Sequence, residues 1–266
     1  MTVSETYRDR PVAHAQRNEW SISQRLLLLA SFALFIGYYS LCSFKVPWLG
    51  DFNRHVAAVH ALYEDFRHPI HEAMPLEGKY TEEYNPLNVA AAAFGRFFEL
   101  SEYGALQWIG VMNLFLYAYA VCLYFRTTSV LPNSALPPAF FLVFSLFLRN
   151  RTWIWASETS FDTLALIQAY PSFLGWSLAL LIFALVERLF DAGRRRYAVT
   201  IALLFSILIL THLITASWVL GIMGVRAIFE LCVHSKLASG EKRTRIFLLY
   251  SRNCDAGDYI YQFARC

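Results

Sequence analysis

One uncharged apolar run near the N-terminus restricts the fold of this chain more than any other feature. The run "RLLLLASFALFIGYYSLCSF", residues 25–44, has no charge after its first residue. At 1.5 Å per residue, about twenty helical residues match the hydrocarbon core of a bilayer, which is about 30 Å thick. Because a polar stretch with several arginines precedes the run and no small-residue cleavage site follows it, we expect a retained membrane helix rather than a signal peptide.

Further apolar blocks follow, in a chain that is 57% hydrophobic and only 16% charged. That composition is far from the average of soluble domains. The block at 136–148 is short, but Pro137 and Pro138 suit the first turn of a helix, and flanking residues can extend it. We predict an all-α membrane protein with about six transmembrane helices, near 26–44, 104–125, 131–148, 172–190, 197–212 and 214–231.

The apolar stretch 198–231 could form one helix or two. Its 34 residues are too long for one untilted span and short for two ordinary ones. Basic residues lie both before the stretch, at 194–196, and after it, at 242–245. Because lysine and arginine accumulate on the cytoplasmic side, both ends are expected inside the cell. We therefore predict two short helices that meet near Thr211 and His212.

The same rule sets the orientation of the whole chain. It places residues 1–25 in the cytoplasm as an N-terminal tail and residues 45–103 outside, as a large lumenal or periplasmic loop. The tail 232–266 is expected in the cytoplasm; it is compatible with a disordered end or with the remnant of an interrupted reading frame. The net charge of +3 sits between spans and indicates orientation, not nucleic-acid binding. Membrane lipids are the expected surroundings, and no CxxC spacing indicates a zinc site.

The outer loop begins with the polar segment "WLGDFNRHVAAVHALYEDF", residues 48–66. Within it, apolar residues recur at three- and four-residue steps, which predicts an interfacial helix with one face against the membrane; these are Val56, Val59, Leu62, Tyr63 and Phe66. Asp51 stands at the helix start and is one turn from His55, whereas His60 points elsewhere.

Asp51 has two alternative roles. As an N-cap, its carboxylate would accept hydrogen bonds from unpaired backbone N–H groups. As a general base, it would take a proton from an acceptor hydroxyl, and protonated His55 would keep it ionised. We assign no metal ligands, although a divalent ion held by Asp51, His55 and another histidine stays an alternative. His68 and His71 flank Pro69 and therefore lack regular helical spacing.

The order of these features resembles a known family. A cytoplasmic stub, one span, a lumenal "GDFNRH" and then "YNPLNVAAAAFGRFFELSEYGALQWIGVMNLFLYAYAVCLYFR" look like the opening of the polytopic glycosyltransferases of the GT-C fold. The likeness is nearest to the protein-mannosyltransferase and aminoarabinose-transferase type, and it covers residues 25–126 best. Two departures are clear: Asn85 stands where a proline is usual, and Asp51 has no second acid beside it.

The resemblance implies an inverting enzyme that moves a sugar from a polyprenyl-phosphate donor to an acceptor on the outer face. Asp51 would carry over as the catalytic base. Tyr84, Asn85, Pro86 and Leu87 would match the motif that leads into a juxtamembrane helix in that family. The resemblance also calls for cations beside the departing phosphate, and the residues that we assign to the substrates are His55, Tyr84, Asn85, Arg149, Arg151, Glu158 and His212.

Simpler interpretations of several candidates stay open. Arg149 and Arg151 are compatible with an aromatic interfacial belt beside Trp153 and Trp155, and His212 with a polar helix end. For the chain as a whole, the alternatives are a multi-pass transporter or channel subunit and a truncated, inactive scaffold. A transporter would need charged or broken segments inside the membrane, for which Arg226 and Gln168 are the two candidates.

Overall fold

The computed structural model describes residues 20–45, 52–67, 84–128, 134–147, 167–192 and 195–238. This part of the chain contains eight helices and no strand, so the predicted all-helical class is confirmed. The helices are α1 Ile22–Lys45, α2 Phe52–Glu64, α3 Pro86–Phe97, α4 Glu102–Thr128, α5 Leu136–Ser145, α7 Pro171–Ala192, α8 Arg195–Thr211 and α9 Leu213–Ala238.

Four of the described helices are long and apolar enough to cross a membrane. The candidate spans are Ile22–Phe44, Glu102–Thr128, Pro171–Phe190 and Leu213–Glu230. They coincide with four of the six spans expected from the apolar blocks. The described chain therefore has the architecture of a multi-pass membrane protein.

The other two expected spans are shorter helices. α5 has ten residues and α8 has seventeen. At 1.5 Å per residue these are about 15 Å and about 25 Å long, below the thickness of a hydrocarbon core. Pro137 and Pro138 stand at the start of α5, where a missing N–H has no cost. α5 thus covers ten residues of the predicted span 131–148.

The stretch 198–231 belongs to two helices separated at His212. The Nδ1 atom of His212 accepts a hydrogen bond from the backbone N–H of Thr215 at 3.3 Å and lies 2.7 Å from the Thr215 hydroxyl, so the imidazole caps the first turn of α9. A Cβ built on Gly175, near the start of α7, would lie 3.4 Å from side-chain atoms of His212 and Thr215. Farther along, Arg226 of α9 reaches Glu187 of α7. α8 and α9 therefore both run along α7, in opposite directions.

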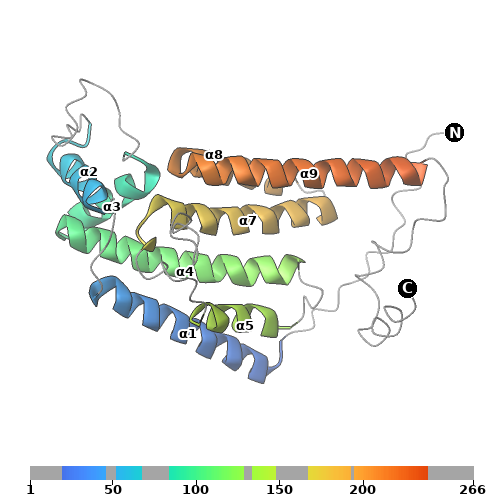
Figure 1. Ribbon diagram of the computed structural model, residues 1–266, viewed down its shortest axis with the longest axis horizontal. Coiled ribbons are helices and arrows are strands. Elements are labelled where there is room, and N and C mark those ends of the chain that lie inside the picture. The colour runs from blue at the N-terminus through green and yellow to red at the C-terminus, as the bar shows by residue number, and fades with distance from the viewer. Residues whose placement is uncertain are drawn as a thin grey trace.

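Figure 1 shows these helices side by side in an elongated bundle, with α2 and α3 gathered at one end. α4 packs against both α1 and α7 and forms the centre. In the most apolar window of α4 and of α7, 50% of the residues are buried, against 11% for α9. One buried cluster joins α1, α4, α5 and α7, and another joins α7, α8 and α9. α9 is thus an outer helix whose apolar surface suits lipid.

The chain enters α7 through a non-helical turn that lies inside the bundle. Gln168, at the centre of this turn, is fully buried, and its Nε2 donates to the Tyr39 carbonyl of α1 at 2.9 Å. Asn113 of α4 donates from Nδ2 to the Gln168 carbonyl at 2.9 Å. Irregular backbone at membrane depth is tolerated where protein surrounds it and satisfies its polar groups. Gln168 therefore has a structural role at this turn.

Candidate functional site

The helices α2 and α3 form a small cap on the start of α4, and this α2–α3 cap contains most of the described candidate residues. Apolar side chains of the three helices form one buried cluster, in which Phe52, Val59 and Leu62 of α2 meet Leu87 and other residues of α3 and α4. Val59 and Leu62 were expected to face the membrane. They pack against protein instead, because α3 covers this face of α2; of the predicted apolar stripe, Phe66 is exposed.

The passage from α3 to α4 depends on close backbone approach. A Cβ on Gly95 would lie 1.6 Å from Tyr63 Oη and 2.7 Å from the Ala105 Cβ, so a glycine allows α2, α3 and α4 to meet here. α3 ends at Phe97 with Phe98 as its C-cap; Glu99 follows with φ 55°, and the N–H of Leu100 donates to the Gly95 carbonyl at 2.9 Å. This is a Schellman-type helix end built without the usual glycine in the left-handed position.

His55 lies on the first turn of α2 and is buried in the base of the cap. Its Nδ1 is 2.9 Å from the amide nitrogen of Asn88, a fully buried residue of α3. With Asn88 as the donor, Nδ1 accepts and the ring proton sits on Nε2. The imidazole also meets the ring of Tyr170 edge to face, with centroids 5.1 Å apart. His55 thus joins α2 to α3 and to the turn before α7.

The segment 84–88, "YNPLN", starts α3. Asn85 is its N-cap: its Oδ1 accepts hydrogen bonds from the N–H groups of Leu87 at 3.0 Å and Asn88 at 3.2 Å. Pro86 follows at the first helical position, where proline is favoured. Tyr84 packs partly buried against the apolar cluster of the cap. Asn85 was expected to contact a substrate, but its buried amide oxygen is occupied by the helix cap.

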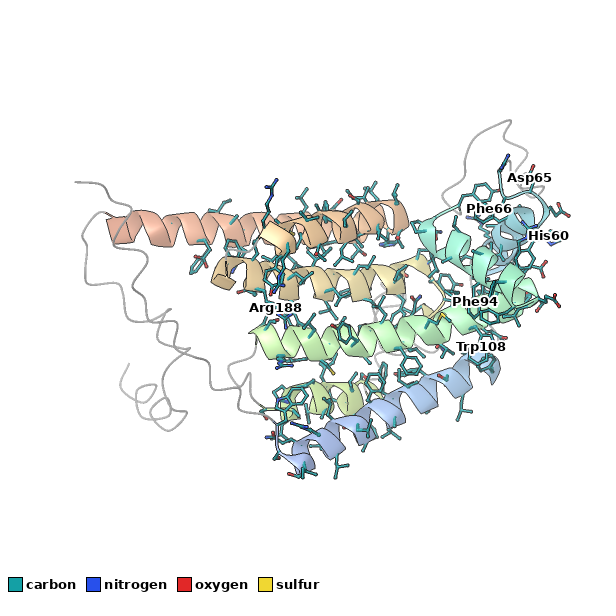
Figure 2. All side chains as sticks on the ribbon, turned by 180° about the vertical axis from the view of Figure 1, so that it is seen from behind. His60, Asp65, Phe66, Phe94, Trp108 and Arg188 are labelled. Atoms are coloured by element: carbon teal, nitrogen blue, oxygen red, sulfur yellow. The ribbon has the colours of Figure 1, made fainter. Side chains whose placement is uncertain are left out.

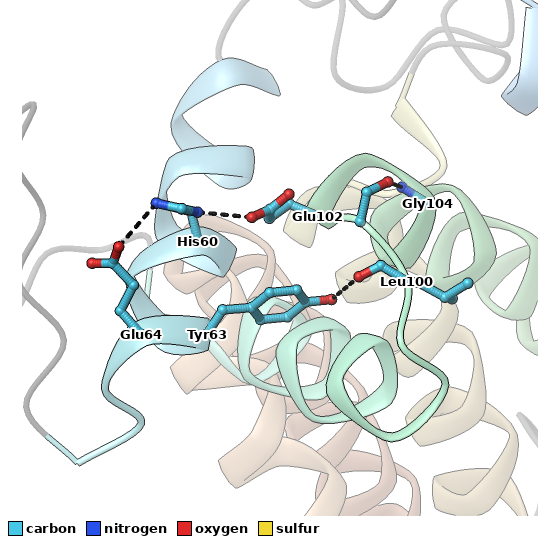
Figure 3. Close-up of polar contacts among 7 residues, drawn as sticks. His60, Tyr63, Glu64, Leu100, Glu102 and Gly104 are labelled. Carbon is cyan, nitrogen blue, oxygen red and sulfur yellow. Dashed lines mark hydrogen bonds and ion pairs between the residues drawn. The ribbon is translucent and has the colours of Figure 1, made fainter.

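The face of α2 that points away from the apolar cluster is exposed, and its side chains contact the segment at the start of α4 (Figure 3). His60 Nδ1 lies 2.7 Å from Glu102 Oε1, and its Nε2 lies 3.3 Å from Glu64 Oε1. Tyr63 donates from its hydroxyl to the Leu100 carbonyl at 3.1 Å. Burial, with a further contribution from the nearby Glu102 charge, raises the pKa of Tyr63 and keeps it a hydrogen-bond donor.

Four predicted site residues lie outside the described residues: Asp51, Arg149, Arg151 and Glu158. The first described residue of α2 is Phe52, which follows Asp51 in the chain. His212 is described, and its imidazole caps α9, as the simpler interpretation had it. It lies beside Gly175 near the start of α7, at the end of the bundle where α3 contacts α8.

Asn88 is the residue of this region that sequence reasoning missed. The sequence feature that could have identified it is a single amide side chain in the otherwise apolar segment "PLNVAAAAF". In the part of the chain that the structure describes, no three His, Cys, Asp or Glu side chains are grouped so as to hold a metal ion. On the exposed face of α2, the two ring nitrogens of His60 point to different carboxylates, those of Glu64 and Glu102, so the three side chains do not converge on one point where an ion could bind.

Comparisons of the chain with protein-family models, with curated proteins and with solved structures give no match. The fold and the cap therefore define the class of the protein: it is a multi-pass helical membrane protein with a small helical cap at one end of its bundle.

Proposed function

We propose that the chain is a membrane glycosyltransferase of the GT-C type. In the proposed reaction, the hydroxyl of an acceptor attacks the anomeric carbon of a sugar carried on polyprenyl phosphate. The new C–O bond forms as the bond to the phosphate oxygen breaks, and the configuration at that carbon inverts. Asp51 takes the hydroxyl proton, and polyprenyl phosphate leaves. Four candidate spans in the described chain support it, because a lipid-linked donor requires a site at the membrane.

The anchored start of α2 is the observation on which this proposal rests. Phe52 is buried and packs against the rings of Tyr103 and Tyr170, at centroid distances of 5.4 and 6.3 Å. His55, on the same turn, is held by Asn88. A general base acts within hydrogen-bond distance of the proton it removes, and catalytic groups need rigid support. The residue that precedes such a helix start is a suitable position for a base.

The resemblance calls for cations beside the departing phosphate, and we assign this role to Arg149 and Arg151 from their residue type and predicted side of the membrane. Glu158 contacts the acceptor, and His55 contacts the substrates. His212 and Tyr84 line the same end of the bundle, which faces the lumen or periplasm when the N-terminus is cytoplasmic. No divalent ion is assigned.

The direct test is donor consumption. The full-length protein is reconstituted in liposomes with a panel of polyprenyl-phosphate sugars labelled in the sugar and with membrane extract as the acceptor source. The proposal predicts release of free polyprenyl phosphate from one donor, together with transfer of label and inversion at the anomeric carbon. Consumption of no donor in the panel, by protein that unfolds cooperatively on heating, would contradict it.

A transporter or channel subunit is the second candidate, and one observation favours it. Arg226 lies within a candidate span, where ionisable residues commonly mark ion or substrate pathways. Its Nε and Nη2 donate to both carboxylate oxygens of Glu187, at 3.0 and 3.3 Å, and its Nη1 contacts Glu230. Proton uptake by proteoliposomes that depends on Glu187 would support this candidate, and its absence would leave the cluster a structural link between α7 and α9.

A further inference from the structure

The end of the bundle opposite the α2–α3 cap is rich in arginine. α7 ends at Ala192 and α8 begins at Arg195, so the last turns of α7 and the first turn of α8 meet there. Arg188 is half-buried, whereas Arg195 and Arg196 are exposed. We call these three residues the α7–α8 corner. Figure 2 labels Arg188 in the half of the molecule away from His60 and Asp65.

The positive charge of the corner is not neutralised by the side chains that the structure describes. Among the side chains that the structure describes, which do not include those of residues 191–194, no carboxylate forms an ion pair with Arg188, Arg195 or Arg196. Glu187 is the neighbour of Arg188 in the chain, but both of its carboxylate oxygens bind Arg226. The first turn of α8 contains no acid. Two arginines therefore lie at the positive end of a helix dipole, which is an unfavourable place for cations unless an anion accompanies them.

Aromatic rings hold guanidinium groups at this end. The Arg196 guanidinium lies 5.1 Å from the centroid of the Tyr197 ring, and its Nη2 donates to the Tyr197 hydroxyl at 3.3 Å. Arg126, at the end of α4, lies 5.6 Å from the Trp20 ring centroid. Tyrosine and tryptophan collect at the headgroup level of membranes, where their rings are amphipathic. This end of the bundle therefore has the composition of a membrane interface.

An exposed apolar stripe continues from the arginines along α8. Val199 and Leu203 are 54% and 62% exposed, and they follow Arg195 at successive steps of four residues. Residues four apart lie on the same face of a helix. One face of α8 thus presents a cationic group followed by an apolar surface directed along the bundle.

We propose that the α7–α8 corner binds the phosphate headgroup of an anionic phospholipid, with the acyl chains of that lipid along Val199 and Leu203. Guanidinium pairs with phosphate through two parallel hydrogen bonds. The apolar stripe distinguishes a lipid from free phosphate, since free phosphate has no surface to bury against it. The proposal is independent of the enzymatic function, because the corner and the α2–α3 cap lie at opposite ends of the bundle.

The test measures lipid retention by native mass spectrometry of the full-length protein in detergent. Phosphatidylglycerol and phosphatidylcholine with identical acyl chains are titrated separately. Wild type should retain phosphatidylglycerol in preference to phosphatidylcholine. R195Q/R196Q should lose affinity for phosphatidylglycerol by about fivefold for each arginine removed, and its affinity for phosphatidylcholine should not change. R67Q/R96Q removes two exposed arginines at the cap end and is the matched control; it should behave like wild type.

Two further arms keep the result decisive. R195K/R196K retains both charges but not the paired hydrogen bonds of guanidinium, so its affinity for phosphatidylglycerol should fall between wild type and R195Q/R196Q even if the glutamine variant folds poorly. Inorganic phosphate, added at the same ionic strength as a chloride control, should not displace the lipid. An unchanged phosphatidylglycerol affinity in R195Q/R196Q, an equal loss in R67Q/R96Q, an affinity of R195K/R196K below that of R195Q/R196Q, or displacement by phosphate would each overturn the proposal.

Discussion

The two histidines of α2 stand five residues apart and experience opposite environments. His55 is buried, and its partner is the amide of Asn88 from another helix. His60 is exposed, and its partners are two carboxylates, Glu64 on its own helix and Glu102 at the start of α4. The contacts of His55 with Asn88 and of His60 with Glu102 both have hydrogen-bond geometry. They differ in whether water can take the place of a partner that a mutation removes.

That difference determines which contact supports the cap. Water replaces a lost partner at the exposed face, so exposed ion pairs contribute about 0–1 kcal/mol. No water replaces Asn88 without a rearrangement, and a buried polar group left unpaired costs about 1–3 kcal/mol. The buried face should therefore hold the start of α2 in place, while the exposed face contributes little to stability.

The largest effect is expected from His55→Ala. It removes a buried ring and leaves the Asn88 amide without this partner, so the free energy of unfolding should fall by about 2–4 kcal/mol. The measurement is reversible unfolding in mixed detergent micelles, with His60→Ala as the matched control on the same helix. A loss below about 0.5 kcal/mol for His55→Ala would show that the two faces are equivalent.

Gly95→Ala tests whether the close packing of α2, α3 and α4 supports the cap as strongly as the buried contact of His55 with Asn88 does. Its Cβ would meet Tyr63 Oη and the Ala105 Cβ at distances that no real contact allows, so α3 has to shift. We expect a loss of about 1–3 kcal/mol, the usual range for overpacking. Tyr63→Leu removes the nearer obstacle and should recover part of the loss in the double variant. Additive losses in the double variant would contradict this geometry.

The Arg226 cluster is an intermediate case between the two histidines. The side chains of Arg226, Glu187 and Glu230 are 30%, 20% and 25% exposed. Arg226→Gln leaves two adjacent carboxylates without their cation and should destabilise the protein by about 1–3 kcal/mol, less than a fully buried pair costs. The swapped variant Glu187→Arg with Arg226→Glu should recover part of this in thermal unfolding. No recovery would mean that shape, rather than charge, links α7 to α9.

The smallest effect is expected from His60→Ala. Exposed pairs of this kind are screened by salt, so the loss should stay within about 0.5 kcal/mol and vanish at about 1 M salt. Unfolding curves at low and high salt provide the measurement. A large loss that persists at high salt would place the support of the cap on its exposed face.

The sequence predicted what depends on local pattern. The apolar block 25–44 and its successors located four candidate spans, and Thr211 with His212 marked the division between α8 and α9. Asn85 followed by proline has the pattern of a helix start, although it was assigned to a substrate. Each of these features is determined by a residue and its near neighbours in the chain, and it can therefore be predicted from the sequence.

Contacts between distant segments could not be predicted. His55 and Asn88 are separated by 33 positions, and the likeness of Val59 and Leu62 to a membrane-facing stripe does not reveal that α3 covers them. An apolar face fits lipid and protein equally well, since both exclude water. The short length of α5 is likewise invisible in a stretch that is apolar throughout.

We propose Asp51, the residue before α2 in the chain, as the base of a sugar transfer, and the decisive variant is Asp51→Asn. Transfer from the active polyprenyl-phosphate donor is measured in liposomes for wild type, Asp51→Asn and the control Asp65→Asn, whose residue is exposed beyond the end of α2. If Asp51 is the base, Asp51→Asn should slow transfer by about 10²–10⁴ with normal membrane insertion, and Asp65→Asn should change the rate little. Wild-type transfer by Asp51→Asn would contradict it.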